Sequence, residues 1–259
     1  MAQALQRFAA ARSQHGQTTA GYLALGLTLA LGLVLAAWIV AASLERIKLA
    51  GDKITVKGYA EEKVLSDAGT WRSIVSVRAA DLPGAYRRLE ADTARVVALV
   101  GATAEAARLR TGPVSTQTLY EMGPGGMQTG RILGYELSRS FEYSASDVQQ
   151  IARLAGEASK LISDGVAINS MPPQYFFTDL NAVKVRLIGA ATRDSRERAQ
   201  QFAANSGVTV GPLRSASQGV FQITSPNSTE TADYGSYDTS TVEKLVKAVV
   251  TVEYAVSRK

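Results

Sequence analysis

The sequence contains no cysteine, and its only histidine is His15, close to the amino terminus. Disulfide bonds, cysteine nucleophiles, iron–sulfur clusters and cysteine-ligated zinc are therefore excluded. Histidine is the commonest general base and transition-metal ligand, so the chain beyond His15 also lacks the residue on which triad chemistry is usually built. We predict no catalytic residue, no metal site and no cofactor, and we expect a protein that is not an enzyme.

Charged side chains are absent from residues 13–44, and residues 21–44 form one apolar run. At about 1.5 Å per residue, a helix of this length crosses the roughly 30 Å hydrocarbon core of a bilayer. A buried core helix would carry a polar stripe, which this run lacks. A cleavable signal peptide is the other alternative, because residues 40–42 are small enough for a cleavage site, but its apolar core usually spans only about 7 to 15 residues. We therefore predict an uncleaved transmembrane helix.

This run divides the chain into four predicted regions. They are a short cytoplasmic leader at 1–20, the transmembrane helix at 21–44, a linker at 45–53 and an extracytoplasmic domain at 54–259. Arg7 and Arg12 precede the helix, while Arg46, Lys48 and Lys53 follow it, so positive charge alone does not set the orientation. A short basic leader without acidic residues usually stays in the cytoplasm, which predicts that the following domain crosses the membrane.

Three glycines lie within the apolar run, at Gly21, Gly26 and Gly32. Small residues allow transmembrane helices to approach closely, so we predict that these glycines pack against the helices of neighbouring subunits in the bilayer. The competing interpretation is that glycine is simply frequent in transmembrane helices.

The net charge beyond residue 44 is mild, because 26 basic side chains face 23 acidic ones. No basic patch interleaved with aromatic residues is present in the sequence. We therefore expect no nucleic-acid partner, and the basic balance needs no acidic partner to explain it.

Apolar periodicity after the linker predicts an α+β domain with a mixed, largely antiparallel sheet and three helices. Alternation over residues 54–60 and 71–77 predicts two strands. Asp81 is the expected N-cap of a first helix, with Pro83 in its first turn, and Gly101 is expected to close it.

A long β-hairpin is predicted from strands at 107–119 and 132–143, with the glycine-rich loop at 123–126 as its tip. Five residues of its second strand are expected to share one buried face, namely Leu133, Tyr135, Leu137, Phe141 and Tyr143. Ser146 and Gln149 form a predicted capping box for the second helix. The remaining predicted elements are that helix at 147–164, a short strand at 166–170, a third helix ending at Gly207, an extended stretch at 208–223 and a terminal strand at 249–256.

Residues 219–244 interrupt this regular pattern with a stretch rich in Ser, Thr, Asn and aromatic side chains. The stretch is longer than ordinary hairpin loops, which favours a functional or docking role. Phe221, Tyr234 and Tyr237 supply amphipathic contact area that suits a protein interface better than a catalytic pocket. We predict that these three residues form an oligomer interface and that a neighbouring subunit orders the segment.

Several stretches of the sequence resemble the SIMPL-domain family over roughly residues 54–256. They are the opening strand ITVKGYAEEKV, the long helix and its continuation VKVRLIGAATRDSRERAQQFAANSGVTVGPL, and the closing GVFQITSPNST, DYGSYDTST and KAVVTVEYAV. The chain departs from the commoner family pattern at residues 65–67, where Leu-Ser-Asp replaces a frequent Pro-Asp.

This resemblance implies a two-layer α/β periplasmic domain that assembles into large, ring-shaped homo-oligomers with a channel-like interior. It also implies a link to envelope or oxidative-stress responses without an established enzymatic activity. The expected location is then the bacterial inner membrane, with a cytoplasmic amino terminus, and the expected partners are the bilayer and further copies of the chain.

Two other functions remain open from the sequence. One is a monomeric or dimeric module that binds a peptide or another ligand, with Tyr175, Phe176 and Phe177 as an aromatic platform. The other is an enzyme that uses carboxylates alone, but no carboxylate pair stands out in the pattern.

Overall fold

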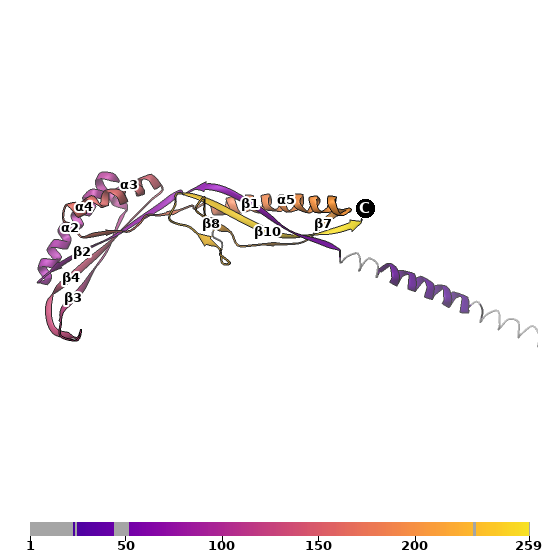
Figure 1. Ribbon diagram of the computed structural model, residues 1–259, viewed down its shortest axis with the longest axis horizontal. Coiled ribbons are helices and arrows are strands. Elements are labelled where there is room, and N and C mark those ends of the chain that lie inside the picture. Colours follow the sequence, from indigo (N-terminus) through magenta and orange to yellow (C-terminus); the bar gives the residue numbers. More distant parts are fainter. Residues whose placement is uncertain (1–22, 24, 44–51, 230–231, 259) are drawn as a thin grey trace, which may run out of the picture. The chain divides into compact units, whose positions relative to one another are not determined.

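The computed structural model describes residue 23 and residues 25–43, 52–229 and 232–258 (Figure 1). The chain divides into two compact units, and each is described by itself. The larger unit consists of Lys57–Arg196 and Ser217–Thr251, and the smaller unit combines the described parts of Met1–Val56, Glu197–Ala216 and Val252–Lys259. The predicted leader and Gly21 lie outside the described residues, as does most of the predicted linker.

The elements confirm the predicted α+β class, with an apolar helix preceding a folded domain of mostly antiparallel sheet. The apolar helix spans Leu25–Ser43. In order, the other elements are β1 (Lys53–Leu65), β2 (Ala68–Ala79), α2 (Leu82–Thr103), a 3₁₀ turn (Ala106–Arg108), β3 (Leu109–Met122), β4 (Gln128–Ala145), α3 (Val148–Ala158), α4 (Lys160–Ser163), β5 (Ile168–Ser170), β6 (Gln174–Phe176), α5 (Leu180–Ser206), β7 (Val208–Gln218), β8 (Gln222–Thr224), β9 (Ser236–Tyr237) and β10 (Glu243–Arg258).

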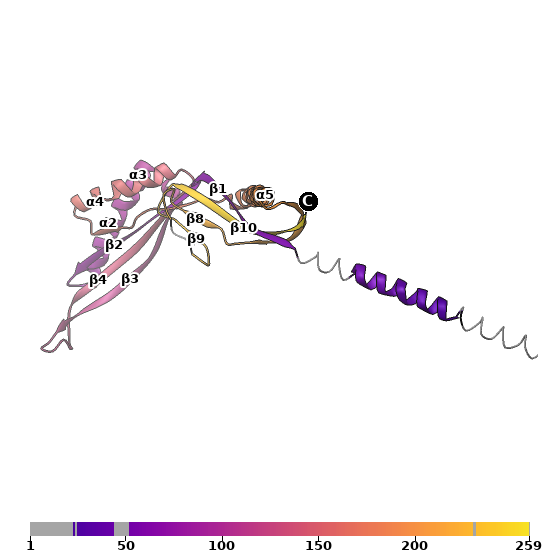
Figure 2. The ribbon, with the colours of Figure 1, turned by 45° about the vertical axis from the view of Figure 1, so that its right-hand side comes forward.

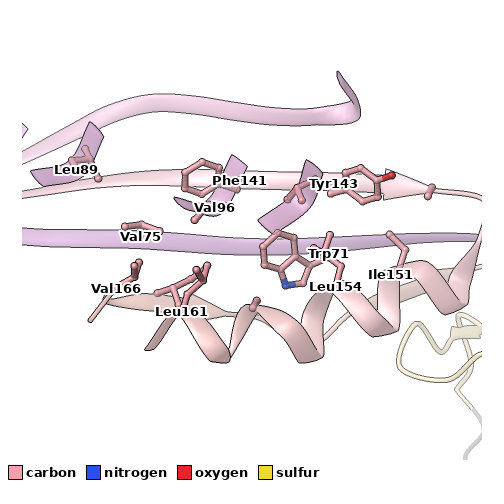
Figure 3. Close-up of a cluster of buried hydrophobic side chains, with 14 of the residues drawn as sticks. Trp71, Val75, Leu89, Val96, Phe141, Tyr143, Ile151, Leu154, Leu161 and Val166 are labelled. Carbon is pink, nitrogen blue, oxygen red and sulfur yellow. The ribbon is translucent and has the colours of Figure 1, made fainter. Parts of the chain in front are cut away.

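The first sheet lies in the larger unit and has the order β3-β4-β2-β5, with β6 also paired to β2. All of its pairs are antiparallel, and the β2–β4 register runs without a break from Gly69↔Ala145 to Ala79↔Tyr135. Its buried face carries Trp71 and Val75 of β2 together with Phe141 and Tyr143 of β4 (Figure 3).

Helices α2 and α3 supply the other half of this core. The buried residues of α2 recur at three- and four-residue steps, and those of α3 include Ile151 and Leu154 (Figure 3). The Trp71 indole nitrogen donates to the Ser170 hydroxyl at 2.8 Å, so its polar edge is satisfied within the cluster. Each large side chain in such a cluster stabilises the fold by about 1.5 to 3 kcal/mol through burial.

The helix ends differ from the predicted ones in three places. Asp81 caps α2 as predicted, because its carboxylate accepts from the Gly84 N–H at 2.8 Å, but the helix continues through Gly101 to Thr103. The N-cap of α3 is Asp147 and not Ser146, since the Asp147 carboxylate accepts two backbone N–H groups of the first turn. The single helix predicted at 147–164 is broken at Ser159 into α3 and α4.

The predicted buried face of β4 is correct only in part. Leu137, Phe141 and Tyr143 are buried, whereas Leu133 is 57% exposed. The reason is a register shift in the β3–β4 pair, where Leu119 faces Gly134 but the next residue, Tyr120, faces Ile132. A skipped residue reverses the alternation, so side chains beyond Gly134 leave the core face.

The glycine-rich tip of the β3–β4 hairpin is confirmed. The Gly123 N–H donates to the Met127 carbonyl at 2.8 Å, and Gly125 and Gly126 adopt φ of +87° and +78°. Only glycine takes up two successive positive φ values without steric cost, which explains the glycine pair in the loop.

The second sheet has the order β1-β10-β8-β9, with β7 also paired to β10. The β8–β9 pair is parallel. In the larger unit, Val183 and Leu187 of α5 form a second core with Val64, Ile223 and Val246. In the smaller unit, Lys53 and Glu253 form an exposed ion pair at 2.7 Å. The terminal strand β10 begins at Glu243, well before the predicted start at 249.

Gly58 of β1 allows the strand to lie directly against α5. A Cβ on Gly58 would lie 1.9 Å from the Ala191 carbonyl oxygen and 2.8 Å from the Ser195 Cβ. The neighbouring Tyr59 N–H donates to the Asp194 carboxylate at 2.7 Å, so the strand is also hydrogen bonded to the helix here.

We therefore expect Gly58→Ala to lower the free energy of unfolding by about 1 to 3 kcal/mol. The added methyl group would overlap the backbone of α5, and β1 and α5 would have to move apart to accommodate it. The measurement is urea unfolding followed by circular dichroism. Gly156→Ala in α3 is the matched control, because its Cβ would meet nothing within 4 Å, and it should stabilise by about 0.5 to 1 kcal/mol. Equal effects of the two changes would show that the β1–α5 contact is not close-packed.

Candidate interaction surface

The segment at 219–244 is folded against its own chain. Its strand β8 pairs antiparallel with β10, with Leu245 opposite Thr224, and pairs parallel with β9, with Gln222 opposite Ser236. The Gln222 side-chain amide donates to the Ala232 carbonyl at 2.7 Å and so closes the loop between the two short strands. The described residues of this segment contact their own chain, and the expectation that a neighbouring subunit orders the segment stays a prediction.

A buried lysine holds the end of the segment. Lys244 is 0% exposed, and its Nζ donates to the carbonyl oxygens of Asp238 at 2.5 Å and Thr241 at 2.8 Å. The Asp238 carboxylate lies 3.9 Å from Nζ, and the Tyr237 ring centroid lies 5.8 Å from it. The ammonium group is thus surrounded by carbonyl dipoles, a carboxylate and a π face, which offset the cost of removing its charge from water.

Asp238 organises the turn around this lysine. Its Oδ1 accepts from the backbone N–H and the hydroxyl of Ser240, and its Oδ2 accepts from the Thr241 hydroxyl. Desolvation raises the pKa of Asp238, but these hydrogen bonds and the Lys244 charge outweigh it and lower the pKa to about 2. Burial lowers the pKa of Lys244, and the Asp238 charge opposes that shift.

The three aromatic residues predicted at the interface have different surroundings. Phe221 is half-buried in the second core, with Lys184 Nζ 5.4 Å from its ring centroid. The Tyr237 hydroxyl accepts from the Phe177 N–H at 2.9 Å and donates to the Phe177 carbonyl at 3.1 Å. Tyr234 is 99% exposed. Phe221 and Tyr237 therefore have structural roles within the chain, and Tyr234 is the residue of the three that a partner can reach fully.

The aromatic platform proposed for a ligand-binding module is not an exposed surface. Tyr175 is buried in the first core, and burial raises the pKa of its hydroxyl. Phe176 packs beside Tyr237 with ring centroids 6.4 Å apart, and Phe177 contacts the second core. Packing explains these residues without a ligand.

A second surface lies at the tip of the β3–β4 hairpin, where the sequence predicts the hairpin but not the exposure of its apolar side chains. Its apolar side chains are exposed, among them Met122 at 64% and Met127 at 76%, with Tyr120, Ile132 and Leu133 beside them. The pairing of β2 with β4 stops at Tyr135, so this end of the hairpin extends beyond β2 (Figures 1 and 2). The two methionines beside the glycine-rich loop could have indicated an exposed apolar tip. The surface was not predicted because the alternation expected in β4 placed Leu133 in the core.

The outer edge of β3 is free in the described part of the chain, because β4 is the only strand to which β3 is paired. A bulge between Thr111 and Val114, around Pro113, disrupts the edge near its base. From Ser115 to Met122 the strand continues without proline. Backbone N–H and C=O groups along an edge of this kind are available to an added strand.

The apolar helix Leu25–Ser43 is long and apolar enough to be a membrane span or a signal anchor. A Cβ on Gly26 or Gly32 would meet nothing within 4 Å, so both positions are open on the helix surface. The packing predicted for them against neighbouring helices stays a prediction. Within the described residues, no group of three or more His, Cys, Asp or Glu side chains is arranged to hold a metal ion.

A family model with the description "SIMPL: Protein of unknown function (DUF541)" matches residues 54–254. No curated protein matches the chain.

Three solved structures show limited similarity. An amidase of the hydantoinase/carbamoylase family from Burkholderia multivorans is 13% identical, with 46% of this chain and 28% of that chain covered and a TM-score of 0.22. A putative amidohydrolase/peptidase from Burkholderia cenocepacia is 18% identical, with 52% and 32% covered and a TM-score of 0.22. A hydrolase from Listeria innocua is 11% identical, with 76% and 91% covered and a TM-score of 0.17. The chain spans about a third or less of the first two structures.

The pKa of Asp238 leads to a prediction about acid stability. Because the folded pKa of about 2 lies below the ordinary value of 3.8, Asp238 stabilises the fold above pH 4 and loses this contribution as the pH falls from about 4 to about 2. Asp238→Asn should cost about 2 kcal/mol at pH 7 and flatten the loss of stability on acidification. Urea unfolding at a series of pH values measures both effects.

The matched control is Asp233→Asn, because Asp233 is exposed in the same segment. This change should leave the free energy of unfolding within about 0.5 kcal/mol of the unmodified protein. Parallel acid-stability curves for Asp238→Asn and the unmodified chain would contradict the role assigned to Asp238.

Proposed function

Since the chain belongs to the SIMPL family, we propose that it is a membrane-anchored envelope protein without enzymatic activity, which assembles through its folded domain into a large ring of identical subunits. The observation that carries the proposal is the β3–β4 hairpin, which combines a free strand edge with an exposed apolar tip. A link to envelope or oxidative-stress responses rests on the family resemblance alone.

The free β3 edge supports self-association because unpaired backbone groups are readily satisfied by a strand of another chain. A ring requires a heterologous contact, in which one surface of each subunit meets a different surface of the next. The hairpin tip, with Met122 and Met127, is one such surface. Methionine side chains adapt to irregular partners, which suits a contact repeated between copies.

Tyr234 supplies a second candidate contact, at the loop between β8 and β9. Its large amphipathic ring loses little conformational entropy when it is buried in an interface. The predicted contributions of Phe221 and Tyr237 are more limited, since both already contact their own chain. In the proposed contact, Phe221 and Tyr237 lie at the border of the interface.

The apolar helix Leu25–Ser43 supports membrane anchoring, with 19 residues that cover about 28 Å as a helix. We propose that it spans the bacterial inner membrane, with the amino terminus in the cytoplasm and the folded domain in the periplasm. One helix per subunit then gathers many helices beneath the ring, where Gly26 and Gly32 allow close approach.

A ligand-binding module is the second candidate function, and one cavity favours it. The cavity has a volume of about 360 Å³ and is lined mainly by hydroxyl-bearing residues of β8, β9 and their loops. The Thr224 and Ser236 hydroxyl oxygens are buried there without a hydrogen-bond partner among the described residues. A small polyhydroxylated ligand would suit this hydroxyl-rich lining.

The test of assembly is the mass of the detergent-extracted full chain, measured by light scattering. The ring predicts a species on the order of ten subunits or more, whereas a monomer or dimer would refute it and favour the ligand-binding module. Changing Met122 and Met127 together to Ser should reduce the mass, because it removes the apolar tip without altering either core.

Ile162→Ser is the control for loss of an exposed apolar side chain, since Ile162 is 59% exposed on α4, away from the hairpin. It should leave the mass unchanged. Tyr234→Ser tests the second contact and should reduce the mass. Tyr237→Phe removes the hydrogen bonds to the Phe177 backbone, and its effect on the mass is compared with its effect on the free energy of unfolding. An unchanged mass in both the methionine and the Tyr234 variants would exclude these surfaces from the contact.

The anchor is tested by the mass of the membrane-bound chain after extraction. An uncleaved anchor predicts a chain that retains residues 1–44, because the apolar helix is needed to hold it in the bilayer. A mature form that begins near Ser43 and washes off the membrane with salt would contradict anchoring. Protease added to intact spheroplasts should cleave the folded domain if it faces the periplasm.

A further inference from the structure

A cavity of about 450 Å³ lies in the larger unit between β2, α2 and the turn that follows α4. This volume is within the range of small-molecule sites in proteins. Three arginines line it, Arg78 from β2 and Arg88 and Arg95 from α2, with Asp92 as the one lining carboxylate. Val75 and Val77 carry the face of β2 that packs on α2, so the Arg78 side chain points to the opposite face and Arg78 borders the cavity with its backbone. Arg88 and Arg95 are therefore the two guanidinium groups at this space, and neither the predicted interface nor the hairpin tip includes them.

Two of the three arginines are held in place by neighbours. Arg78 donates through Nε to Glu136 at 2.8 Å, and Arg95 donates through Nη1 to the Asp92 carboxylate and the Asp164 carbonyl, both at 3.2 Å. A guanidinium group has five N–H donors, so Arg95 keeps donors for another acceptor at the cavity. Its two contacts hold the Arg95 side chain in place before a ligand arrives.

Arg88 differs from the other two. Its Nη1 lies 3.5 Å from the Arg78 carbonyl oxygen, at the limit of a hydrogen bond. No carboxylate in the described part of the chain lies within ion-pair distance of it. Arg88 is therefore a cation at the cavity without a counter-ion in the described part of the chain, beside Arg95, which has spare donors.

We propose that this cavity binds an anion that carries a phosphate group. A phosphate has three terminal oxygens directed along different axes, which the guanidinium groups of Arg88 and Arg95 can engage from different directions, whereas a planar carboxylate fits one such fork. Arg78 is paired with Glu136 and Arg95 with Asp92, so the charge of Arg88 is the one that a bound anion would neutralise. A soluble phosphate compound and a lipid headgroup share this chemistry.

The test is calorimetric titration of pyrophosphate into the full chain, held in phosphatidylcholine nanodiscs at low ionic strength. One site per chain is expected, with affinity that falls as salt is added. Arg88→Gln should weaken binding about tenfold or more, and Arg88→Lys should weaken it less, because it keeps the charge and loses the bidentate fork.

Arg87→Gln is the matched control, because Arg87 is the exposed neighbour on α2, carries the same charge and does not line the cavity. It should leave the affinity unchanged. Absence of binding to the unmodified chain, or equal weakening by Arg87→Gln and Arg88→Gln, would overturn the proposal. Unfolding curves of the two variants should coincide, since neither side chain is part of a core.

A second titration separates the two sources of phosphate. Short-chain phosphatidic acid, which is soluble as single molecules, presents the headgroup without a bilayer. Binding about tenfold tighter than pyrophosphate would indicate a lipid headgroup, and equal or weaker binding would indicate a free phosphate compound. In both cases Arg88→Gln must weaken the binding if this cavity is the site.

Discussion

The pairing of β2 with β4 is the constraint on which the larger unit depends. The register runs unbroken from Gly69↔Ala145 to Ala79↔Tyr135 and places Trp71, Phe141 and Tyr143 on one face. Because side chains alternate across a strand, a slip of one residue would turn this whole set to the opposite face. β2 also pairs with β5 and β6, so the same strand positions the segment that leads into α5.

The end of this pairing has a structural consequence. Beyond Tyr135 the hairpin has no β2 beneath it, and the register shift at Gly134 turns Leu133 away from the core. The same irregularity thus explains why apolar side chains are exposed at the tip. In the proposed assembly, a neighbouring subunit covers what the sheet of one chain leaves uncovered.

Local signals in the sequence were sufficient for most elements. Asp81 and Pro83 marked the start of α2, and the glycine pair marked the hairpin tip, because caps and positive φ values are properties of a few adjacent residues. The sequence did not predict the N-cap at Asp147 or the helix break at Ser159. Ser146 and Asp147 are both good N-cap residues, and the residues around Ser159 have similar helix propensities, so the sequence does not distinguish the alternatives. The resemblance to the SIMPL family was confirmed over residues 54–254.

The candidate site was harder to predict than the fold. Phe221, Tyr234 and Tyr237 look equivalent in sequence, but hydrogen bonds to Phe177 and contacts in the second core distinguish them only in three dimensions. Lys244 gave no sequence signal, because its burial depends on carbonyl groups supplied by a turn. The arginines that line the cavity of about 450 Å³ come from β2 and α2, which are separated along the chain and meet only through packing.

The absence of cysteine makes a direct test of self-assembly through the hairpin possible. A single M127C substitution can carry a photoreactive benzophenone at the tip, with I162C as the control, and the labelled chain is illuminated in its native membrane. A heterologous ring predicts a ladder of cross-linked subunits from M127C and little from I162C. Monomer alone from M127C, or equal products from both positions, would contradict assembly through the β3–β4 hairpin.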